Sequence, residues 1–112
     1  MALHHAQPGV PVPVQPFGAS LQGQKTSALF KSETLEVIRL VLMAGKRLPV
    51  HQVPGEMTLQ CLEGQLTLSQ NGNHQTLSAG QLLFLPAQTP HEVEAVQDSS
   101  ALITIVLQGH DR

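Results

Sequence analysis

The chain has 112 residues, of which 41% are hydrophobic and 12% are charged, and its formal net charge is −2. This length predicts one domain, and so few charges argue against disorder. The charge balance gives no basic surface for nucleic acid, and no apolar run approaches the roughly 18 residues that a membrane span needs. Cys61 is the only cysteine, which excludes an internal disulfide. Because the N-terminus also lacks a signal-peptide pattern, we expect a cytoplasmic protein.

The N-terminal part differs from the rest of the chain. Its prolines include Pro8, Pro11, Pro13 and Pro16, and valine alternates with proline over residues 10–14. Such a segment favours an extended path but cannot donate a full ladder of hydrogen bonds. We predict a Pro-rich arm over residues 1–24, laid on its own domain or on a partner subunit, and a domain over residues 25–112.

From residue 26 onward the pattern predicts a series of short strands, and no segment has a long helical period. Asn71-Gly72 separates two alternating runs and predicts a type I′ hairpin turn. Strands at this spacing are typical of an all-β sandwich or barrel. The expected strands span 27–30, 35–43, 57–62, 66–70, 73–77, 82–85, 91–96 and 101–107.

Two segments have the spacing of a known pair of motifs. The first has Gly45, His51 and Gly64, with Val53 and Met57 between them. It resembles the first motif of the cupin superfamily, which reads Gly, five residues, His-x-His, three or four residues, Glu, six residues, Gly. Val53 stands where the family has its second His, and Met57 stands where it has Glu.

The second segment has Gly80, Pro86 and His91 in the positions of the second cupin motif. That motif reads Gly, five residues, Pro-x-Gly, two residues, His, three residues, Asn. Gln88 replaces its second Gly and Ala95 its Asn. The resemblance covers about residues 27–107. It implies a small, single-domain, RmlC-like cupin with a jelly-roll β-barrel, which we expect to form a homodimer.

The resemblance also implies where a metal would bind. Cupins with intact motifs hold a divalent transition metal such as Fe, Mn, Ni or Zn through three His and one Glu. His51 and His91 match two of these ligands. Valine has no lone pair and a thioether favours softer metals, so the site is incomplete. Glu56, one residue from the expected Glu, is the first candidate for a third ligand, and Cys61 is the second.

Strand parity predicts which side chains face the barrel interior. His91 and Val93 alternate with Glu92 and Glu94, so the imidazole shares the interior face. The same reasoning gives a mostly apolar cavity with two imidazoles at its mouth, a common form for a small-molecule site. The predicted lining is His51, Val53, Met57, Cys61, His91 and Val93, with Phe84 at the floor.

Arg39 shares parity with Val37 and Val41, and both orientations have a consequence. If this face is the cavity, Arg39 could bind a substrate carboxylate. If the other face points inward, Arg39 lies on the surface, which we favour because long charged side chains are rarely buried unpaired.

Three classes of function follow. The first is a module that binds a small molecule in the barrel, with His51 and His91 orienting it. The second is a metal-dependent enzyme similar to cupin dioxygenases or isomerases. The third is a metal-free enzyme similar to cupin epimerases, with one imidazole as general base. Because two of the four family ligands are replaced, we favour the first class.

Overall fold

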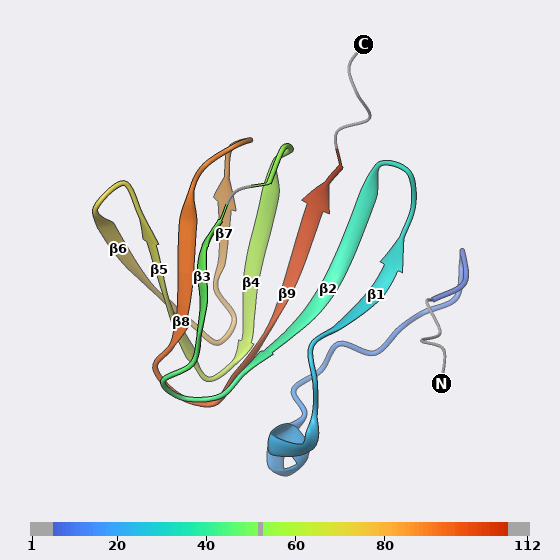
Figure 1. The fold of residues 1–112 in the computed structure, drawn as a ribbon. Helices are drawn as coiled ribbons and strands as arrows, with labels where there is room; N and C mark the ends of the chain where they lie inside the picture. Colours follow the sequence, from blue (N-terminus) through green and yellow to red (C-terminus); the bar gives the residue numbers. More distant parts are fainter. Residues whose placement is uncertain (1–5, 52, 108–112) are drawn as a thin grey trace.

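The computed structural model describes residues 6–51 and 53–107, with only the backbone for residues 49–51. Over these residues the chain forms two antiparallel sheets that face each other (Figure 1). This confirms the predicted all-β jelly-roll fold. One sheet has the order β1 (Ser27–Lys31), β2 (Leu35–Leu42), β9 (Ser99–Val106), β4 (Met57–Glu63), β7 (Leu82–Leu85). The other has the order β3 (Arg47–His51), β8 (His91–Ala95), β5 (Gln65–Gln70), β6 (Asn73–Ser78).

The predicted hairpin lies between β5 and β6. Asn71 and Gly72 have φ angles of 49° and 78°, as a type I′ turn requires. Strand β3 was not predicted, because Pro49 interrupts a short run. The structure places this strand at the edge of its sheet, where a missing backbone donor is tolerated.

The core lies between the two sheets and consists of residues of one parity. On β4, for example, Met57 and Leu59 are buried, whereas Thr58 and Gln60 on the opposite face are partly exposed. Leu40 of β2 and Ile103 of β9 belong to the same cluster. Burial of these side chains is the main stabilising contribution to the fold.

Residues 6–24 run along the outer side of the sheet next to β1 (Figure 1). The backbone N–H of Ala6 donates to the carbonyl of Leu29 at 2.7 Å. The segment ends in a 3₁₀ helix, η1 (Gly18–Gly23), whose Leu21 is buried. The division of the chain at residue 24 stays a prediction.

The position of Arg39 corrects the sequence interpretation. Its face of β2 does point away from the core, as we favoured, but its side chain is only 4% exposed. The N-terminal segment covers it: the guanidinium donates to the carbonyl of Gln15 at 2.8 Å and lies 4.0 Å from the centre of the Phe17 ring. Strand parity predicted that Arg39 faces away from the core, but it could not predict that the N-terminal segment covers the side chain.

Glu63 compensates the buried charge of Arg39. Its carboxylate lies 3.4 Å from the guanidinium and accepts hydrogen bonds from the backbone N–H groups of Phe17 and Gly18 and from the Ser100 hydroxyl. Burial alone would raise the pKa of Glu63, but these hydrogen bonds and the charge of Arg39 lower it below its ordinary value. The contacts of Arg39 and Glu63 therefore hold residues 15–18 against β2, β4 and β9.

Candidate functional site

A cavity of about 230 Å³ lies between the two sheets. Its lining is almost entirely aliphatic, and within the described part of the chain His91 and Thr26 are its polar side chains. The lining consists of Thr26, Ile38, Leu40, Leu48, Val53, Met57, Leu59, His91, Val93, Ile103 and Ile105. We call this space the inner cavity.

His91 is a predicted site residue that the fold holds in a buried position. It opens β8, is 2% exposed, and its Nδ1 lies 2.9 Å from the carbonyl oxygen of Thr89. A carbonyl only accepts, so Nδ1 carries the hydrogen. In the neutral ring the lone pair is then on Nε2. The Cα of His51 on β3 is paired with that of His91, while the His51 side chain lies outside the described part.

Val53, Met57 and Val93 line the inner cavity, as the sequence predicted. Cys61 shares the inward face of β4 and is fully buried, but it lies in the core beyond the lining. Burial raises the pKa of its thiol. The thiol therefore behaves as a small apolar group.

Phe84 requires a correction. The prediction placed it at the floor of the cavity, but its side chain is 56% exposed. Within β7 the inward positions are Leu83 and Leu85, and the two alternate positions point away from the core. All four residues of β7 are apolar, so the strand lacks the alternation of polar and apolar residues that would indicate its inward face.

The family's metal ligands are not reproduced by the residues at these positions. Val53 has no donor atom, and Met57 is a buried thioether. Glu56, the predicted third ligand, is exposed and is not part of the cavity lining. Among the described residues no three His, Cys, Asp or Glu side chains gather. Tight sites for these metals use three or four protein ligands, so this donor set does not fit.

Backbone contacts join the loops that carry the two motifs. The N–H of Gln88 donates to the carbonyl of Val53 at 2.8 Å. Gln88 stands where the family motif has glycine and keeps a left-handed φ of 61°. A residue other than glycine therefore occupies a left-handed backbone position in this loop.

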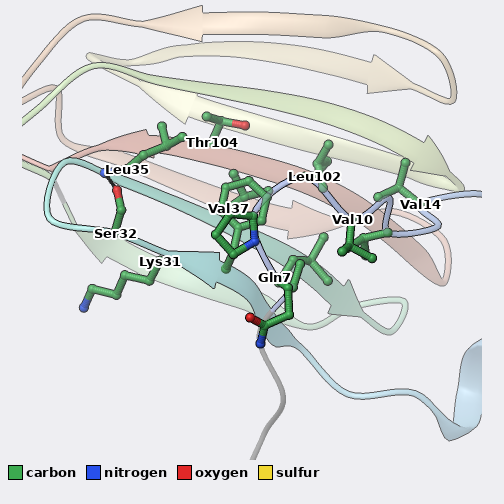
Figure 2. Close-up of a pocket in the computed structure, with 15 residues that line it drawn as sticks. Gln7, Val10, Val14, Lys31, Ser32, Leu35, Val37, Leu102 and Thr104 are labelled. Atoms are coloured by element: carbon green, nitrogen blue, oxygen red, sulfur yellow. Dashed lines mark hydrogen bonds between the residues drawn. The ribbon is translucent and has the colours of Figure 1, made fainter.

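Sequence reasoning missed a second hollow of about 670 Å³ on the outer side of the five-stranded sheet. Figure 2 shows it between the N-terminal segment and the outward side chains of β1, β2 and β9, including Val37 and Leu102. Val10, Val12 and Val14 of the N-terminal segment also line it. The Val-Pro alternation was the available signal, since it predicted an apolar arm.

Comparison with known proteins agrees with this geometry. The family model for the cupin domain matches residues 38–107, so the chain belongs to the cupin family. Among curated proteins none matches the sequence. No helix in the described part of the chain is long and apolar enough to cross a membrane.

Solved structures with the same fold include other cupins and an enzyme. A cupin superfamily protein from Desulfitobacterium hafniense has a TM-score of 0.77 at 14% identity, covering 96% of this chain and 100% of that one. An RmlC-like cupin from Desulfovibrio desulfuricans has a TM-score of 0.68 at 28% identity, covering 92% and 97%. The DMSP lyase from Ruegeria pomeroyi has a TM-score of 0.68 at 21% identity, covering 88% and 54%.

Proposed function

We propose that this cupin binds a small, compact organic molecule in the inner cavity, with His91 and His51 orienting its polar group. The observation that carries the proposal is a buried imidazole on the wall of a cavity lined almost wholly by aliphatic side chains. Few polar groups placed in an apolar concave site are the usual means of fixing a ligand's orientation.

The size of the cavity limits the ligand. Its volume of about 230 Å³ is below the roughly 300–1,000 Å³ of sites for drug-sized molecules. It corresponds to the volume of about seven or eight water molecules, at roughly 30 Å³ each. A single substituted ring fits this limit, whereas a nucleotide or a disaccharide does not.

The chemistry of the lining limits the ligand further. Among the described residues of the lining none carries a fixed charge, so a charged ligand would lose its hydration without gaining a partner. His91 is the one imidazole among the described lining residues, and its Nδ1 lies 2.9 Å from the carbonyl oxygen of Thr89. We therefore infer a neutral ligand with one polar group.

The test uses phenol and toluene, which share a ring of the right size and differ in one polar group, the hydroxyl of phenol. Binding is followed through the methyl NMR signals of the lining residues. The wild-type protein is expected to bind phenol about fivefold more tightly than toluene, which corresponds to one hydrogen bond of about 1 kcal/mol. His91→Leu should remove this preference. His74→Leu, which changes an exposed histidine bonded to Ser69, is the matched control.

A second variant tests the location. Val53→Phe places a ring in the cavity and should abolish binding of both probes. The proposal fails if neither probe shifts the lining methyl signals. It also fails if the shifts appear at Leu35 and Leu102, which line the outer hollow, because the ligand would then occupy that hollow.

A further inference from the structure

The outer hollow, on the outer side of the five-stranded sheet, is covered by a segment that is anchored at both ends. At one end the backbone N–H of Ala6 donates to the carbonyl of Leu29. At the other end the carbonyl of Gln15 accepts from the guanidinium of Arg39. Between these anchors, residues 7–14 pass over the outward side chains of β1, β2 and β9 (Figure 2). We call residues 7–14 the roof.

The sequence of the roof explains why a space remains beneath it. Val10, Val12 and Val14 line the hollow, whereas Pro11 and Pro13 between them are exposed. Proline has no backbone N–H, so the roof cannot form the full hydrogen-bond ladder of a further strand. The fixed φ of proline also favours an extended path. The alternation therefore directs valine side chains towards the sheet while the backbone stays apart from it.

The hollow has the size and the apolar surface of a small-molecule site. The sheet contributes Leu35, Val37 and Leu102 to its floor. Val10 of the roof is 57% exposed, so an occupant of the hollow would cover apolar surface that is now in water. The volume of about 670 Å³ lies within the roughly 300–1,000 Å³ of such sites. It equals the volume of about 22 water molecules, at roughly 30 Å³ each.

The two ends of the hollow differ in polarity. Figure 2 shows Lys31 and Ser32 at one end, where the chain turns from β1 into β2. Leu102 lies towards the other end, because its partner in the register of β9 and β2 is Arg39. Figure 2 shows Val14 at this end as well. The hollow thus offers an apolar end to an aliphatic chain and a polar end to a head group.

The polar end favours an uncharged head group. Lys31 is the one charged side chain among the described residues of the lining, and its cross-strand partner on β2 is Glu36. The ammonium group disfavours a cation, and the carboxylate beside it offsets the attraction of an anion. The remaining polar side chains of the lining are an amide and two hydroxyls, from Gln7, Ser32 and Thr104. These groups form hydrogen bonds without requiring a charged partner.

We propose that the outer hollow binds an uncharged single-chain amphiphile, such as an aliphatic alcohol. Its chain lies between the roof valines and the sheet, and its head group lies at Ser32. Burial of the aliphatic chain supplies the binding free energy. The site is separate from the inner cavity, because the two lie on opposite faces of the same sheet and share no described lining residue. Failure of binding at one site would leave the other site intact.

The test compares 1-octanol, octanoate and octylammonium, which have the same chain length and differ in the charge of the head group. Each is titrated into the wild-type protein, and binding is followed through the methyl NMR signals of Val12, Val37 and Leu102. 1-Octanol is expected to bind at least about tenfold more tightly than either ion, because a charged head group loses hydration without gaining a full partner. 1-Hexanol should bind about tenfold more weakly than 1-octanol, because it buries two fewer methylene groups.

A pair of variants tests the location. Leu102→Trp places a large ring in the floor of the hollow and should weaken 1-octanol binding by at least about tenfold. Leu82→Trp is the matched control, because Leu82 lies in the same cross-strand row on the outward face but is 62% exposed and is not part of the lining. The amide signals of Gln15 and Gly18 show whether the roof keeps its anchor in both variants.

Three results on the wild type, which need no variant, would overturn the proposal. The first is that 1-octanol leaves the methyl signals of Val12, Val37 and Leu102 unchanged up to its solubility limit. The second is that octanoate or octylammonium binds as tightly as 1-octanol, since the head group would then be charged. The third is that the shifts appear only at Val93 and Ile103, because the chain would then occupy the inner cavity.

Discussion

Replacing Glu63 by glutamine leaves the buried guanidinium of Arg39 without its counter-charge. The two side chains are 14% and 4% exposed, so water screens their interaction little. Removing one partner of a buried pair costs about 3–5 kcal/mol. Because Glu63 is partly exposed and glutamine retains a hydrogen-bond acceptor, we expect Glu63→Gln to lower the free energy of unfolding by about 3 kcal/mol. For a domain of this size that lowers Tm by roughly 12 °C or more.

The assay is urea unfolding of the wild type, Glu63→Gln, Arg39→Met and the double variant. Each single substitution leaves one charge of the pair without its counter-charge, whereas the double variant removes both charges. The double variant should therefore cost less than the sum of the singles, by about 1–3 kcal/mol. Arg47→Met breaks an exposed pair, with side chains 60% and 22% exposed, and should cost under about 1 kcal/mol. Additive single effects would refute the coupling.

Three further predictions follow from individual residues. The pKa of Glu63 is lower in the folded than in the unfolded protein. The contribution of Glu63 to the free energy of unfolding is therefore complete above the unfolded pKa of about 4.3 and is lost as pH falls through the folded pKa. In Glu63→Gln the free energy of unfolding should depend less steeply on pH in that range. Gln88→Gly should raise the unfolding free energy by about 1 kcal/mol in urea unfolding by relieving a left-handed φ, whereas Ala87→Gly should not. Gly55→Ala should destabilise by several kcal/mol or prevent folding, since its Cβ would overlap the backbone carbonyl oxygen of Val106; a calorimetric Tm near that of the wild type would contradict this.

The fold was predictable because its signals are local. The hairpin at Asn71-Gly72 and the alternation around His91 and Val93 each follow from backbone geometry over a few residues. The spacing of the two motifs added the topology. What could not be predicted depends on contacts between distant segments. Arg39 is buried because residues 15–18 cover it, and no local pattern contains that information.

The candidate site likewise contains residues whose positions were predictable from the sequence and residues whose positions were not. Val53, Met57, His91 and Val93 line the inner cavity as parity predicted. Phe84 does not, because a uniformly apolar strand gives no indication of its inward face. The contact between His91 Nδ1 and the Thr89 carbonyl was not predictable from strand parity, since parity does not give the orientation of a ring.

We propose that an organic molecule, and not a transition metal, occupies the inner cavity beside His91. Elemental analysis of protein purified without a metal-affinity tag tests it most directly, after incubation with Fe(II), Mn(II), Ni(II) and Zn(II) and removal of the excess. We expect clearly substoichiometric metal, with no difference between the wild type and His91→Leu. Near one equivalent of a single metal, lost in His91→Leu, would contradict it.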